Sequence, residues 1–210
     1  MLRSLVGSEM CIRDSGYAVQ ATSVAGVAQR TGTTIYYIEM LPDTGRQPVF
    51  ALSPVEADVD IVIAAEWMEA GRAIMRGFVS PDRTVLIASS HRALAEVEKA
   101  VPGNGIADDT EVHLAATKSA RRVIAFDMDS IAVNAGTMIS ASLFGAIAGA
   151  DVLPFAVDEF RKTVRRGGRG FEASLAAFEV AFERAQSESD AILYPDNALA
   201  ECLRPNLIGP

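Results

Sequence analysis

Hydrophobic positions divide the chain, from residue 16 onward, into short apolar runs that alternate with longer helical patterns. Four of the runs are dense in β-branched and aromatic residues, which favour strands. They occupy residues 33–39, 60–65, 84–89 and 122–126. These runs are continuously apolar, as expected of strands that are covered by helices on both faces. We therefore expect all four strands near the centre of a mostly parallel sheet.

Apolar residues at three- and four-residue steps predict the helices between and after these strands. The predicted helices cover residues 66–76, 94–100, 109–119, 131–148, 158–164 and 171–187. The last pattern is the strongest, because Phe171, Leu175, Phe178 and Phe182 would line one face. Alternating strands and helices predict an α/β fold, a three-layer α/β/α domain over residues 16–190. Residues 191–210 show little periodicity, and we expect a tail or the start of a further region there.

Composition narrows the class of protein. Half of the residues are hydrophobic, so a globular core is expected, and the net charge of −8 argues against a nucleic-acid partner. No apolar run reaches the roughly 20 residues that span a bilayer, so no membrane association is expected. Two cysteines without a C-x-x-C pair and two histidines predict no metal site on this chain and a reducing, cytoplasmic location.

Residues 1–15 do not fit the pattern of the rest. Residues 5–15 are similar to the in-frame translation of a transposase adapter used in preparing sequencing libraries, and we expect residues 1–15 to be such an artefact. A natural leader is the alternative, but its apolar stretch would be broken by Gly7, Ser8 and Glu9. Residues 16–19 then read as a strand entered partway, so we expect the segment that preceded it to be missing.

The loop expected between the first extended run and the strand at residue 34 carries the strongest candidates for binding. Gln29, Arg30 and Gly32 lie there, and a guanidinium offers a planar, bidentate fork to a carboxylate, a phosphate or a partner subunit. Arg30 could equally fix its own loop through backbone carbonyls. Both readings stay open.

Residues 134–150 combine Asn134, a further candidate contact, with small side chains on neighbouring turns: Ser142, Gly145, Ala146 and Gly149. Such a helix permits close approach of a second helix or a subunit. We favour packing within the domain against its own sheet over an intersubunit face.

Other polar groups receive weaker assignments. The basic, glycine-rich residues 165–170 could cradle a phosphate such as that of coenzyme A, although a solvated connector is the favoured reading. The carboxylates Asp127 and Asp129, like Asp108 and Asp109, are expected to complement helix starts. His91 follows Ser89 and Ser90 at a strand end, where ligands often bind in α/β sheets, but a surface histidine is favoured. His113 is expected to be structural.

Three segments in order resemble one protein family. Gly26, Ala28, Gln29, Arg30 and Gly32 match the G-M-A-Q-R-G-G segment of the indolepyruvate branch of 2-oxoacid:ferredoxin oxidoreductases. The small-residue stretch 134–150, followed by Leu153-Pro154, and the glycine-led stretch 168–178 resemble the later helices of the family's γ-type domain. The chain thus resembles a fragment of the small (beta) subunit of indolepyruvate:ferredoxin oxidoreductase.

The resemblance implies a subunit of an enzyme complex rather than a complete enzyme. Members of the family decarboxylate 2-oxoacids oxidatively, here aryl pyruvates, with thiamine pyrophosphate and iron–sulfur clusters on a larger partner subunit, coenzyme A as acyl acceptor and ferredoxin as electron acceptor. It also implies that the family's first strand and G-x-G-G-Q-G loop are missing, and that no residue of this chain is catalytic. A free-standing nucleotide- or coenzyme A-binding α/β module is the alternative, and an assembly factor is a third possibility.

Overall fold

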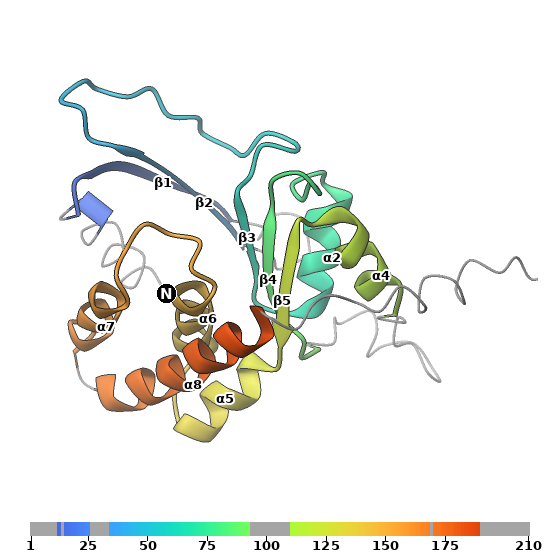
Figure 1. Cartoon of the computed structure of the whole chain (residues 1–210), viewed down its shortest axis with the longest axis vertical. Helices are drawn as coiled ribbons and strands as arrows, with labels where there is room; N and C mark the ends of the chain where they lie inside the picture. Colours follow the sequence, from blue (N-terminus) through green and yellow to red (C-terminus); the bar gives the residue numbers. More distant parts are fainter. Residues whose placement is uncertain (1–11, 14, 26–33, 93–109, 169, 190–210) are drawn as a thin grey trace, which may run out of the picture.

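The computed structural model of the chain describes residues 12–13, 15–25, 34–92, 110–168 and 170–189. A sheet of parallel strands lies at the centre of Figure 1, with helices on either side and a separate hairpin above one helical layer. The predicted helix at residues 94–100 lies outside the described residues.

Three of the four predicted strands form the parallel sheet. They are β3 (Ile61–Ala64), β4 (Val85–Ser89) and β5 (Arg122–Phe126), in the order β3-β4-β5. The register sets Ala64 beside Ala88, and Ser89 beside Phe126. The carboxyl ends of the three strands therefore meet at one edge of the sheet.

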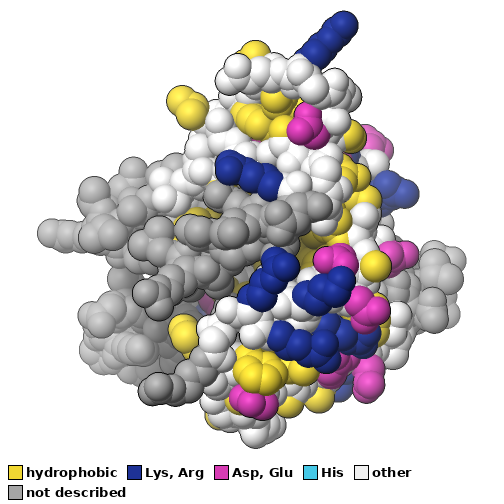
Figure 2. Space-filling model, turned by 90° about the vertical axis from the view of Figure 1, so that its left-hand side faces the viewer, with side chains coloured by type: hydrophobic (Ala, Val, Ile, Leu, Met, Phe, Trp, Pro, Cys, Tyr) yellow, Lys and Arg dark blue, Asp and Glu magenta, His cyan; other side chains and the backbone are white. Residues whose placement is uncertain are grey.

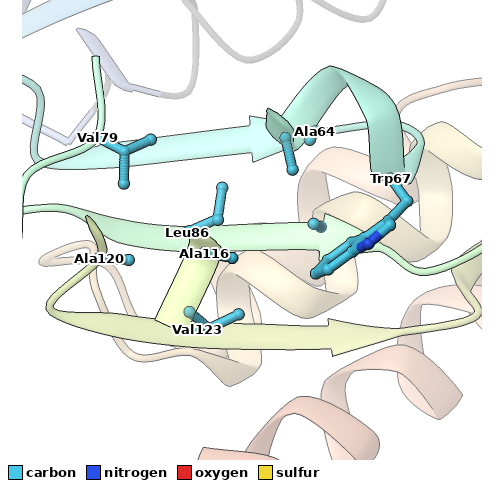
Figure 3. Packing of buried hydrophobic residues seen from close by; sticks show 9 residues of the cluster. Ala64, Trp67, Val79, Leu86, Ala116, Ala120 and Val123 are labelled. Carbon is cyan, nitrogen blue, oxygen red and sulfur yellow. The ribbon is translucent and has the colours of Figure 1, made fainter. Parts of the chain in front are cut away.

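Both faces of β4 are buried, which explains its uninterrupted apolar sequence. Leu86 and Ala88 face α2 (Trp67–Met75) and α4 (Thr110–Ser119), and together with Trp67 they belong to one core cluster (Figure 3). Ile87 faces the other way, into a second cluster with Ala146 of α6 (Ile139–Gly149) and Ala181 of α8 (Phe171–Ser189). The predicted three-layer α/β/α arrangement is confirmed.

The predicted strand at residues 33–39 is present, but it is not part of the parallel sheet. It is β2 (Thr34–Pro42), which pairs antiparallel with β1 (Tyr17–Ala25) in a two-stranded sheet of its own, and not with the parallel strands. The expectation of a central position was therefore wrong. None of the β2 side chains is fully buried, because β2 pairs with an earlier strand close in sequence and is not enclosed between two helical layers as β4 is.

The predicted helix at residues 131–148 is divided into α5 (Met128–Ala135) and α6. Gly136 ends α5 with a left-handed φ of 73°, a conformation that glycine adopts without a steric penalty. The Thr137 amide donates to the Ala132 carbonyl at 2.9 Å, and the Thr137 hydroxyl lies 2.9 Å from the Ser174 hydroxyl of α8. The expectation of one continuous helix was wrong because the apolar pattern continues across this turn.

The small residues of α6 allow a close approach to α8, so the contact lies within the domain as expected, but Gly145 and Gly149 meet a helix and not the sheet. A Cβ added to Gly145 would collide with the carbonyl oxygen of Phe178 and lie 2.9 Å from its carbonyl carbon. A Cβ on Gly149 would collide with the carbonyl oxygen of Phe182. Backbone and side chain of α8 thus occupy the space that larger residues of α6 would need.

Aromatic rings connect this helical layer to the hairpin. Tyr17 of β1 meets Phe155 edge-on at 5.4 Å between ring centroids, and Phe155 lies 6.3 Å from Phe160 of α7 (Val157–Arg165). Phe160 and Phe178 both lie within about 6 Å of Phe144, at 5.2 and 6.0 Å. Such ring pairs add to the free energy of folding beyond the area they bury.

The glycine contact makes a direct prediction. Gly145→Ala should lower the free energy of unfolding by about 3 kcal/mol, because α6 and α8 must separate to admit one methyl group. Ser140→Ala, at an exposed position of the same helix, is the matched control and should change stability by less than about 0.5 kcal/mol. Urea titrations of both variants measure the difference, and equal midpoints would contradict the close packing.

Candidate functional site

Three polar side chains lie close together at the carboxyl edge of the parallel sheet. In open α/β sheets this edge is where ligands bind. Ser89 ends β4, His91 follows it by two residues, and Asp127 follows the last residue of β5. The strand register brings the three together, since Ser89 lies beside Phe126 and the Ser90 amide donates to the Phe126 carbonyl at 2.9 Å.

Ser89 orients the ring of His91. The Met128 amide donates to Ser89 Oγ at 3.0 Å, and the same oxygen lies 2.8 Å from His91 Nδ1. An amide can only donate, so Ser89 Oγ accepts this bond, and its proton and second lone pair both remain available to Nδ1. The contact through Nδ1 fixes the ring of His91 and leaves Nε2 outside this pair.

The backbone of His91 is fixed as well. Its carbonyl accepts a hydrogen bond from the Trp67 amide at 3.2 Å, at the start of α2. Glu66 caps the same helix by accepting from the Met68 amide at 3.1 Å. Trp67 is 1% exposed, and its ring lies 4.1 Å from that of the exposed His113, so His113 packs on this helix start. Ring and backbone of His91 are thus held by two different elements.

Asp127 caps α5, as the sequence predicted. Its carboxylate accepts from the Ser130 amide at 2.9 Å and from the Ser130 hydroxyl at 2.6 Å. These bonds, foremost that from the hydroxyl, hold the pKa of Asp127 below its ordinary value, and the charge of nearby His91 acts in the same direction. The edge therefore presents an ionised carboxylate beside the imidazole.

Serine, histidine and aspartate in proximity do not form a nucleophilic site here. Ser89 has no exposed surface, and its oxygen is engaged by an amide and by Nδ1, so it cannot attack a substrate. Among the three side chains, the groups left to meet a ligand or a neighbouring subunit are Nε2 of His91, which is half-buried, and the exposed carboxylate of Asp127. The arrangement can supply an oriented imidazole nitrogen beside a carboxylate.

The candidate contacts predicted from sequence lie away from this edge or outside the described residues. Gln29, Arg30 and Gly32 belong to residues 26–33, which the structure does not describe. Asn134 is exposed near the end of α5, seven residues after Asp127 in sequence and so about 10 Å further along the helix. Sequence reasoning noted His91 but missed its link to Ser89. The sequence did contain a signal for this site. Ser89 is a polar residue at the end of β4, and Asp127 is a polar residue between β5 and α5.

The basic connector at residues 165–170 is flanked by ion pairs. Arg165 and Arg166 are exposed, and Figure 2 shows Lys and Arg side chains in the lower part of that face with acidic side chains among them. Arg161 binds Glu179 at 2.7 and 2.9 Å and thereby lowers the pKa of that carboxylate, while Lys162 contacts Glu159 at 2.6 Å. Much of the positive charge beside the connector is therefore neutralised within the domain, which agrees with a solvated connector.

Two classes of site are not found in the part of the chain that the structure describes. No group of three or more His, Cys, Asp or Glu residues there could hold a metal ion. Within the same residues, no helix has the length and apolar character needed to cross a membrane.

The described residues thus form an α/β/α domain with Ser89, His91 and Asp127 together at the carboxyl edge of its parallel sheet. The model of the family "Pyruvate ferredoxin/flavodoxin oxidoreductase" matches residues 6–184. The chain belongs to this family.

Solved structures share the fold at low sequence identity. Pyruvate oxidoreductase subunit PORC from Thermotoga maritima superposes with a TM-score of 0.57 at 16% identity, covering 86% of this chain and 87% of that one. The gamma subunit of a keto/oxoacid ferredoxin oxidoreductase from Geobacter sulfurreducens gives 0.55 at 16% identity, covering 87% and 90%. Among curated proteins, none matches the sequence.

The Ser89 hydrogen bonds predict a dual effect of one substitution. Ser89→Ala should destabilise the fold by about 1–3 kcal/mol, because the buried Met128 amide loses its acceptor. The same change should remove the hydrogen bond at Nδ1 of His91, seen in ¹⁵N spectra as a change in the chemical shift of that nitrogen. Ser90→Ala, which keeps the backbone bond to Phe126, should alter neither; unchanged His91 spectra in Ser89→Ala would refute this hydrogen bond.

The cap of α5 predicts a pH dependence. The pKa of Asp127 is lower in the folded chain, so its contribution is complete above the unfolded value of about 4 and is lost as the pH falls through the folded pKa. Asp127→Asn should retain the cap geometry and remove this dependence. The difference in unfolding free energy between wild type and variant should be constant above about pH 5 and shrink in acid. A difference that does not change with pH would contradict the lowered pKa.

Proposed function

We propose that this chain is the small subunit of a 2-oxoacid:ferredoxin oxidoreductase complex, and that a larger partner subunit carries the redox chemistry. The family match over residues 6–184 is the observation that carries this proposal. The two solved structures of the same fold support it, because both are named as subunits. The polar edge fits such a role, since Ser89 is buried and bonded there while the oriented imidazole of His91 is left to meet a partner.

The residues of this chain do not fit the cofactors of the reaction. Iron–sulfur clusters are held by four cysteine thiolates, and the chain has two cysteines, Cys11 and Cys202. No set of side chains for a divalent cation, which accompanies a bound pyrophosphate, lies among the described residues. The proposal therefore assigns thiamine pyrophosphate and the clusters to the partner, with coenzyme A as acyl acceptor and ferredoxin as electron acceptor of the complex.

For the substrate we propose indolepyruvate and related aryl pyruvates. The support is the resemblance of residues 26–32 to the G-M-A-Q-R-G-G segment of the indolepyruvate branch. Within that segment Gln29 and Arg30 are proposed to contact the substrate carboxylate or the partner subunit, with Asn134 as a further contact. A guanidinium suits either a carboxylate of the substrate or one of the partner.

A dye-reduction assay tests the proposal. The isolated chain should show no 2-oxoacid-dependent reduction of a viologen dye, whereas the chain combined with its cognate large subunit should turn over indolepyruvate in preference to pyruvate. The large subunit alone is the control. Robust activity of the isolated chain would sink the proposal, and preference for pyruvate would overturn only the substrate class. Specific, stoichiometric binding of coenzyme A or a nucleotide by the isolated chain would favour the free-standing module instead.

A further inference from the structure

The segment that joins the hairpin to the parallel sheet, residues 43–60, is held against one face of the hairpin. Glu39 of β2 accepts from the Ala51 amide at 2.6 Å, and Gln20 of β1 donates to the Ala51 carbonyl at 2.9 Å. Thr22 of β1 donates to the Leu52 carbonyl at 3.0 Å. Gln20 and Glu39 are cross-strand partners, so these side chains share one face of the hairpin.

Further bonds stiffen both ends of this connection. The Tyr37 hydroxyl donates to Glu39 at 2.7 Å, and burial together with this bond raises the pKa of Tyr37 to about 12. At the far end, Arg83 pairs with Asp60 at 2.7 Å and with Asp58. The segment also contains Pro48 and Pro54, which restrict its backbone. The connection is thus fixed before any partner binds.

On this fixed segment, large apolar side chains point outward. Val49 is 97% exposed, Leu52 76% and Val55 59%. We call these three residues the apolar ridge. In Figure 2, hydrophobic side chains gather in the upper part of the face, where the hairpin and its connection lie. A preorganised set of exposed apolar groups is typical of a binding surface, because little conformational entropy remains to be lost.

The hairpin of β1 and β2 needs packing against other parts of a protein to be stable. A two-stranded sheet is marginally stable alone, and β1 pairs only with β2 among the described strands. One face meets the helical layer through Tyr17 and Phe155, and the other meets the connecting segment. The ridge is the outermost layer of this stack.

The acidic side chains around the apolar ridge indicate which kind of partner would bind there. Residues 39–60 contain five carboxylates, at positions 39, 43, 56, 58 and 60, and the cations beside them are Arg46 and Arg83, which pairs with Asp58 and Asp60, so the surroundings keep a net negative charge. Two copies of this chain meeting ridge to ridge would bring these like charges together, which disfavours self-association. A partner with an apolar patch and a basic rim would satisfy both the ridge and its surroundings.

We propose that the apolar ridge docks the larger subunit of the oxidoreductase complex, through an apolar patch edged by Lys and Arg on that subunit. This inference rests on the proposed function and names the surface of this chain that makes the contact.

A matched pair of double variants tests the docking surface. Val49→Gln with Leu52→Gln should weaken binding to the tagged cognate large subunit by about 10-fold or more in biolayer interferometry. Met75→Gln with Val180→Gln replaces two other exposed apolar residues, 89% and 51% exposed, and should bind as wild type does. Both variants should melt at the wild-type temperature, because the replaced side chains are exposed.

The outcomes separate the two proposals. Absence of binding by the wild-type chain would overturn the proposed function together with the ridge contact. Wild-type binding that survives both double variants equally would overturn the ridge contact alone. A dimer of the isolated chain in sedimentation velocity, lost in the ridge variant, would assign the ridge to self-association instead.

Hydrogen exchange gives a readout that needs no variant. In the complex, amides of residues 49–56 should be protected at least about 10-fold more than in the free chain, while those of α2 should be unchanged. Protection that falls on α2 and spares residues 49–56 would contradict the proposal.

Discussion

Burial of β4 on both faces is the constraint on which the rest of the structure depends. Leu86, Ile87 and Ala88 have no exposed surface, and they alternate between the two core clusters. Removing consecutive side chains from water on opposite faces requires a helical layer on each side. The same strand ends in Ser89, whose hydroxyl is as deeply buried and orients His91. Core and candidate site are therefore built on one strand of five residues.

The sequence predicted the parallel strands well because double burial leaves an unmistakable pattern. Continuous apolar runs at β4 and β5 are mostly buried between the helices above and below, whereas β3 has the same apolar content with Ile63 exposed. The run at β2 has the same β-branched and aromatic content, but content does not reveal the partner strand. Its half-buried side chains suit a hairpin as well as a sheet. Strand type was thus predictable and strand placement was not.

Turns and individual side-chain contacts were harder to predict than the buried faces of helices and strands. Hydrophobic spacing continues from α5 into α6, and only the left-handed φ of Gly136 marks the boundary. At the site, His91 could be noted from its place after a strand, but its bond to Ser89 and its proximity to Asp127 depend on β5 lying beside β4 in a particular register. Pairings between distant segments set that register, and a single sequence does not display them. The close approach at Gly145 was predictable because small residues recurred at helical spacing.

The tight seam between α6 and α8 also bears on how the molecule opens under thermal fluctuation. Where helices pack backbone against backbone, a small displacement of one helix already forfeits a large share of the contact energy at that point. The hairpin is attached differently, by one edge-on ring contact at Tyr17 and by the connecting segment with its Arg83 ion pairs. Its backbone bonds should consequently exchange through local excursions that leave the three layers closed. The chain thus combines a rigid three-layer body with a hairpin that opens more readily as a unit, while the connecting segment stays bound to the hairpin face.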